Sequence, residues 1–188
     1  MKIKRNEKGF TLVEIAIVMV IIGLLIGGVL KGQAMIQNAK VKRVVKLADE
    51  IRAGVMSFYD KYGKYPGDEN INKIPPGDTH TTGNGNGKVT DAERYELFHD
   101  LQLAGLVSGS YNGTSDFPKH PFGDDIHLGW MNPGTEVSNH YFRLDNLPSE
   151  VCMAIDAKYD DGIWNKGTIM GAKDYKEGEM LNYFYLLF

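Results

Sequence analysis

An uninterrupted apolar stretch near the N-terminus is the feature of this 188-residue chain that most constrains its fold. Residues 10–30 are apolar or small except for Thr11 and a single carboxylate, Glu14. A helix of this length rises about 1.5 Å per residue and reaches roughly 30 Å, the thickness of the hydrocarbon core of a bilayer. A charged carboxylate at mid-depth costs about 2.5–3.5 kcal/mol, so Glu14 needs a partner. The stretch therefore predicts a membrane-spanning helix with one functional acid.

The leader in front of this stretch, residues 1–9, carries four cations and one acid. Cations beside an apolar span stay on the cytoplasmic side, so the leader is predicted to be cytoplasmic. A cleaved secretory signal is disfavoured, because the apolar run exceeds the about 7–15 residues of such a signal and no small-residue cleavage site follows it. An uncleaved signal anchor is the alternative that hydropathy alone favours.

The junction between the leader and the apolar run reads KGFTLVE over residues 8–14. It resembles the signature that prepilin peptidase recognises in type IV pilins and type II secretion pseudopilins. The resemblance implies cleavage between Gly9 and Phe10, followed by N-methylation of the new amine of Phe10. It also implies that Glu14 pairs with the Phe10 amine of a neighbouring subunit during assembly, which neutralises both charges in a medium of low dielectric constant. The alternative is that Glu14 only reaches the lipid headgroups.

The helical pattern continues beyond the apolar stretch. Apolar residues recur at steps of three and four with charged residues between them, and the stripe consists of Val41, Val44, Ala48, Ile51, Val55, Phe58 and Tyr62. This pattern predicts one helix over residues 10–62, with residues 10–30 in the membrane and residues 31–62 backing a globular domain. Gly63 and Pro66 are predicted to end it. A coiled coil is the alternative for the second half.

The remaining residues, 63–188, are predicted to form an α+β head with a small antiparallel sheet and short helices. The predicted helices are one over residues 91–104, ended by Gly105, and a short one capped by Ser149 and ended at Gly162, for which a strand is the alternative. The predicted strands cover residues 126–131, 140–144, 168–172 and 181–188. The last of these is apolar or aromatic on nearly every residue, so we expect a central strand covered on both faces, or a subunit contact. Together with the long helix, this is the pilin-like fold that the resemblance implies.

The loop predicted at residues 66–88 leads into a candidate calcium site. The segment from residue 82 to 93 aligns with the twelve-residue loop of an EF-hand. The candidate ligands are Thr82, Asn84, Asn86, the backbone carbonyl of Lys88, and Glu93. An EF-hand loop begins with aspartate, whereas this one begins with Thr82, so the predicted site is weak. The alternative is that Thr90 and Glu93 form a capping box that opens a helix without any metal.

A second candidate calcium site lies in an Asp-rich segment and comprises Asp156, Asp160 and Asp161. The alternative is a solvated helix C-terminus. Cys152 is the only cysteine, so no intrachain disulfide forms, and we expect this residue to be a small buried apolar one. Among the proteins that the chain resembles, many pilins close the C-terminal region with a disulfide, whereas several pseudopilins use calcium instead. No other cofactor is expected.

Composition and motifs exclude several classes of function. Of the 21 basic and 24 acidic side chains, four and one lie in the leader, which leaves 17 and 23 and a net charge of −6. That balance argues against a bulk electrostatic grip on nucleic acid. The histidines lack the paired spacing of a helical zinc site, and no GxSxG elbow, P-loop or dinucleotide fingerprint occurs. His120 and His127 flank Asp124 and Asp125, a grouping that we interpret as polar loop residues. The chain is predicted to be the substrate of an enzyme, not an enzyme.

The resemblance implies a structural subunit of a pilin-like filament, either a type II secretion pseudopilus or a type IV pilus. The implied partners are prepilin peptidase, other copies of the chain, other pilin-like subunits, the inner-membrane assembly platform and membrane lipid, with no nucleic acid. The implied location is the inner membrane, crossed once, with the head in the periplasm. The alternative is a non-polymerising, membrane-anchored module that binds calcium, carbohydrate or DNA. A DNA-uptake pilin shares the motif but gains no support from the acidic head.

Overall fold

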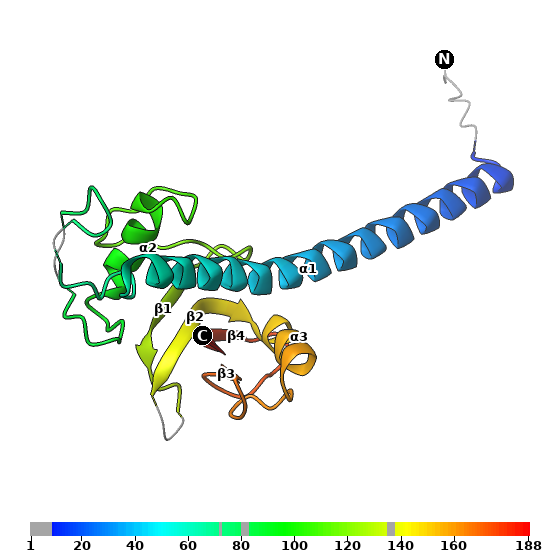
Figure 1. Cartoon of the computed structure of the whole chain (residues 1–188). Coiled ribbons are helices and arrows are strands. Elements are labelled where there is room, and N and C mark those ends of the chain that lie inside the picture. The colour runs from blue at the N-terminus through cyan, green and yellow to red at the C-terminus, as the bar shows by residue number, and fades with distance from the viewer. Residues whose placement is uncertain (1–8, 72, 80–82, 135–137) are drawn as a thin grey trace, which may run out of the picture. The chain divides into compact units, whose positions relative to one another are not determined.

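The computed structural model describes residues 9–71, 73–79, 83–134 and 138–188. Its fold is α+β and pilin-like, as predicted, with a long N-terminal helix, a small antiparallel sheet and short helices (Figure 1). The elements in chain order are α1 (Leu12–Tyr62), α2 (Arg94–Leu103), β1 (Ile126–Met131), β2 (Asn139–Pro148), α3 (Ser149–Tyr159), β3 (Ile169–Gly171) and β4 (Met180–Leu187). The chain divides into two compact units, of which the first ends at Ala39 and the second runs from Lys40 to Phe188.

In the first unit, the apolar side chains of α1 are exposed within the chain. Leu12, Leu24 and Leu30 are 86%, 74% and 61% exposed. An 18-residue window of α1 has a mean hydropathy of 2.8, and none of it is buried. By length and composition, α1 is therefore able to cross a membrane, and its lack of cover distinguishes it from the core helix of a soluble protein.

In the second unit, α1 packs its apolar stripe into the core. The buried members are Val44, Ala48, Ile51, Val55 and Phe58, and Val41 and Tyr62 are partly buried. The helix ends after Tyr62, where Gly63 adopts a φ of +71° and its N–H donates to the Tyr59 carbonyl at 2.7 Å. The predicted helix, its buried face and its end are thus confirmed.

The four strands form one antiparallel sheet in the order β1-β2-β4-β3. Phe142 and Leu144 of β2 and Phe184 of β4 are fully buried and belong to the same core as the stripe of α1. Arg52 of α1 donates from Nη2 to the carbonyl of Leu187 at 2.9 Å. The sheet therefore packs against the second half of α1.

The strand positions are close to those predicted, with differences in length. β1 has the predicted bounds, β2 begins one residue earlier and ends four residues later, at Pro148, and β3 is shorter. β4 lies between β2 and β3, so it is central, as predicted. Leu181, Phe184 and Leu186 are buried, whereas Asn182 and Tyr183 are exposed. Successive side chains of a strand alternate between its faces, so each face of β4 is covered along part of its length, and the expected cover on both faces is met only in part.

The two short helices differ from prediction at their starts. α2 begins at Arg94, because the preceding residues form a turn in which the N–H groups of Glu93 and Arg94 both donate to the Thr90 carbonyl, at 3.1 and 3.0 Å. α3 begins at Ser149 and ends at Tyr159, before the predicted stop at Gly162, and Pro148 is its N-cap, so the predicted cap at Ser149 is wrong. The N–H of Ser149 donates to the Glu179 carbonyl at 2.9 Å, which places this residue inside the first turn.

Candidate functional sites

Thr11 and Glu14 form a capping box at the start of α1. The Thr11 N–H and hydroxyl each donate to Glu14 Oε2 at 2.8 Å, and the Glu14 N–H donates to Thr11 Oγ1 at 3.2 Å. The sequence analysis missed this role, although the T-x-x-E spacing is its usual signature. Glu14 therefore has a local function in starting the helix, in addition to the inter-subunit pairing that the resemblance implies.

The predicted cleavage site precedes α1. Gly9 and Phe10 lie outside the helix and are exposed. A Cβ built on Gly9 would meet nothing within 4 Å, so the fold itself does not require glycine there. An extended, accessible backbone is what a protease needs, and the glycine adds no side chain to obstruct its approach.

The first calcium candidate is held together by hydrogen bonds within the chain. Thr82 lies outside the described residues. Glu93 Oε1 accepts from the side-chain amide of Asn84 at 2.7 Å, and Oε2 accepts from the N–H and hydroxyl of Thr90 at 2.7 and 2.6 Å. The side-chain oxygens of Asn84 and Asn86 accept from the N–H groups of Asn86 and Lys88 at 3.1 and 2.8 Å. The contact of Glu93 with Thr90 that the alternative predicts is therefore present, but it lies in the turn before α2, which begins at Arg94 without a side-chain capping bond.

The second calcium candidate brings its three carboxylates together. Asp156, Asp160 and Asp161 each offer an oxygen, and these atoms lie within 4.8 Å of one another. All three side chains also organise the surrounding loop. Asp156 accepts from Gly162 N–H at 3.0 Å and from the Tyr175 hydroxyl at 2.6 Å, and Asp160 accepts from Ile169 N–H at 2.8 Å. Burial raises the pKa of Asp156, and the charges of Asp161 and Asp160 add to this effect.

Cys152 is fully buried, as predicted. Burial raises the pKa of its thiol far above the ordinary value, so the residue behaves as an apolar side chain and not as a nucleophile. No described residue offers it a disulfide partner.

His120 and His127 meet at Asp145. The Nε2 atom of His120 lies 2.7 Å from the Asp145 carbonyl, and that of His127 lies 3.1 Å from Asp145 Oδ2. Both imidazoles are buried, and His127 is on β1, so interpreting the pair as polar loop residues is wrong for His127. Asp125 instead pairs with Lys119 at 2.9 Å.

A group of buried carboxylates next to α2 was missed by the sequence analysis. Glu69 and Asp78 come from the loop after α1, and Glu96 and Asp100 come from α2. The sequence contains a pattern that predicts this burial, because residues 96 and 100 share the helical face of the buried residues 97 and 101. An acid on an apolar face indicates a special environment.

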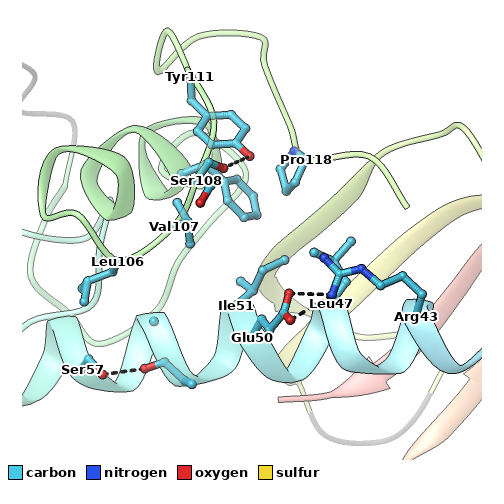
Figure 2. A pocket seen from close by; sticks show the side chains of 13 residues that line it. Arg43, Leu47, Glu50, Ile51, Ser57, Leu106, Val107, Ser108, Tyr111 and Pro118 are labelled. Atoms are coloured by element: carbon cyan, nitrogen blue, oxygen red, sulfur yellow. Dashed lines mark hydrogen bonds and ion pairs between the residues drawn. The ribbon is translucent and has the colours of Figure 1, made fainter. Parts of the chain in front are cut away.

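A groove of about 600 Å³ runs along the second half of α1 (Figure 2). One wall is α1 and the other is the segment that follows α2, which approaches α1 closely at Gly54, where a Cβ would lie 3.4 Å from the Leu106 carbonyl. Arg43 and Glu50 form an ion pair of 2.8 Å in the groove, and the Tyr111 hydroxyl donates to the Ser108 carbonyl at 3.2 Å. Arg43 pairs with Glu50 and Tyr111 with Ser108, and most of the other residues that line the groove are apolar.

Comparison with known proteins identifies the N-terminal segment. The prokaryotic N-terminal methylation motif matches residues 4–30. This motif is the prepilin-type signal of type IV pilins and pseudopilins, which confirms the resemblance carried by residues 8–14. No curated protein and no solved structure matches the chain.

Proposed function

We propose that this chain, which carries the prepilin-type signal, is a structural subunit of a pilin-like filament, either a type II secretion pseudopilus or a type IV pilus. In this proposal prepilin peptidase cleaves between Gly9 and Phe10, and the new amine of Phe10 is methylated. The chain then polymerises through α1 with copies of itself and with other pilin-like subunits, on an assembly platform in the inner membrane. The chain needs no catalytic group of its own for this role.

The observation that carries the proposal is the unburied apolar surface of the first half of α1. Residues 15–30 are all apolar or small. None of the 18-residue window of high hydropathy in α1 is buried by the rest of the chain. Such a surface is stable only in lipid or against other helices. A membrane covers it before assembly, and neighbouring subunits cover it in a filament, so one segment serves both states.

The location follows from the same segment. The cations of the leader hold it on the cytoplasmic side, and the helix crosses the membrane once. In this proposal the second unit lies in the periplasm, or outside the cell where the filament extends beyond it.

The test is to follow the N-terminus and the filament fraction together, after co-expression with a prepilin peptidase and an assembly platform. We expect wild type to begin at N-methylated Phe10 by mass spectrometry and to enter the sheared filament fraction. Gly9→Val should retain Met1 and stay with the membrane. Gly23→Val is the matched control for processing alone and should begin at N-methylated Phe10, because a Cβ at Gly23 also meets nothing within 4 Å in its own chain and the position lies beyond the cleavage site.

Two results would contradict the proposal. A wild-type chain that keeps Met1 in the presence of the peptidase would exclude prepilin processing. A processed chain that never leaves the membrane fraction would instead support the non-polymerising anchored module.

A further inference from the structure

Four acidic side chains are buried together where the loop after α1 meets α2. Glu69, Asp78, Glu96 and Asp100 are 1%, 3%, 3% and 0% exposed. Buried carboxylates are rare unless a cation, a set of hydrogen bonds or a proton compensates for the lost water. Whether a cation, hydrogen bonds or a proton replaces the lost water at each carboxylate therefore indicates the function of the cluster.

Three side chains of this region present their ligand atoms to one another. Asp78, His99 and Asp100 each offer one atom, and these atoms lie within 4.8 Å of one another. The Nδ1 atom of His99 lies 4.0 Å from Asp78 Oδ1. Asp100 Oδ2 accepts from Gly67 N–H at 2.7 Å, whereas Asp100 Oδ1 is buried without a hydrogen-bond partner among the described residues.

Glu69 is the most unusual member. Its carboxylate is buried, and its side-chain hydrogen-bonding neighbour in the described part of the chain is the carboxyl group of Asp100. Burial raises its pKa, and the charges of Asp78 and Glu96 raise it further. Burial and the charge of Glu69 likewise raise the pKa of Asp100. The carboxylates of Glu69 and Asp100 thus face each other, and two ionised carboxylates repel unless a proton or a cation lies between them.

The backbone of the loop packs closely against the start of α2. Gly67 adopts a φ of +80°, and a Cβ there would lie 2.4 Å from the Glu93 carbonyl and 3.0 Å from Leu97 N. The loop therefore reaches the start of α2 with its main chain, which fixes Glu69 next to Asp100.

We infer that Glu69, Asp78 and Asp100, with His99 as a nitrogen ligand, form a divalent-cation site that fastens the loop to α2. Three carboxylates and an imidazole are the donors of Mn²⁺ and Zn²⁺, whereas Ca²⁺ takes oxygen ligands alone. The site is distinct from both calcium candidates in its residues. It would provide a cross-link in a chain whose single cysteine cannot form one internally.

The experiment measures thermal unfolding and metal content of the full chain in detergent, with Mn²⁺, Zn²⁺ or Ca²⁺ and after treatment with a chelator. At a cation concentration of roughly a hundred times Kd, we expect Mn²⁺ or Zn²⁺ to raise Tm by about 5–10 °C. Mass spectrometry of the metal should find about one ion per chain.

The key variant is Glu69→Gln, which removes a charge and keeps a side chain that can hydrogen-bond to Asp100. Without cation it should be at least as stable as wild type, because repulsion with Asp100 is relieved. With cation it should show less than a third of the wild-type Tm rise. Asp100→Asn should behave in the same way, since its amide oxygen still accepts from Gly67 N–H.

Asp156→Asn is the control, because it alters the other carboxylate cluster and should retain the full Mn²⁺ or Zn²⁺ response. Equal Tm values for wild type with each cation and with chelator would show that protons alone neutralise the cluster, and would overturn the inference. Loss of the response in Asp156→Asn but not in Glu69→Gln would also overturn it. None of these outcomes depends on filament assembly.

Discussion

At the scale of single residues, His140 shows how a buried side chain makes the fold sensitive to pH. Its Nε2 atom accepts from the Val89 N–H at 3.1 Å, so the ring is neutral in the folded chain. Its ring lies 4.9 Å from that of Tyr65 and 5.1 Å from that of Trp130. Burial lowers the pKa of His140, and the charge of Asp68 opposes this only in part. A protonated ring would lose the bond to Val89.

This residue predicts a loss of stability in mild acid. The unfolded chain takes up a proton at His140 near pH 6.5 while the folded chain does not, so stability falls as the pH drops below that value. The free energy of unfolding should fall by at most about 1.4 kcal/mol per pH unit on account of His140. His140→Gln keeps an acceptor for Val89 and should remove this part of the loss, leaving the part due to His120, whose pKa is also lowered by burial. Urea unfolding followed by tryptophan fluorescence measures both, and equal pH dependence of the two proteins would contradict the assignment.

At the scale of elements, the second half of α1 is held by its apolar stripe, and Phe58 is its largest fully buried side chain. Phe58→Ala should lower the free energy of unfolding of the head by about 3–5 kcal/mol, because it leaves a cavity in the core. Met56→Ala lies two residues away on the same helix and is 45% exposed, so its effect should stay within about 0.5 kcal/mol. Urea unfolding of both variants checks this, and similar losses would mean that α1 does not pack as described.

Elements with a strong local pattern were predictable, whereas contacts between distant segments were not. The steps of three and four in α1 identified its buried residues, and the apolar run at residues 126–131 located β1. The T-x-x-E spacing occurs at both Thr11 and Thr90, but the sequence analysis interpreted only the second as a capping box. The contact of Glu69 with Asp100 depends on how the loop packs against α2, which no local pattern contains. The start of α3 depends on Glu179, 30 residues beyond Ser149, and was therefore mispredicted.

At the scale of the whole molecule, the two parts of α1 lie in different compact units, and the chain covers the apolar side chains of only one of them. From Lys40 onward the helix buries its apolar stripe in the core, whereas up to Ala39 its apolar side chains are exposed. The same helix is thus a core element in the second unit, and we propose that it is an assembly element in the first. Glu14 lies in the part that the chain does not cover, where its charge has to be met by something outside the chain or by the local cap.

The two roles of Glu14 are separable by a pair of variants. Glu14→Gln keeps the capping contact with Thr11, because glutamine also forms capping boxes, but it removes the charge that would pair with the Phe10 amine of a neighbour. Thr11→Val removes the hydroxyl of the cap and keeps the charge. If inter-subunit pairing governs assembly, Glu14→Gln should insert normally and enter the sheared filament fraction at least about ten-fold less, which corresponds to about 1.4 kcal/mol. Thr11→Val should then assemble within about two-fold of wild type. The reverse order of the two variants would show that helix initiation, and not charge pairing, is what Glu14 provides.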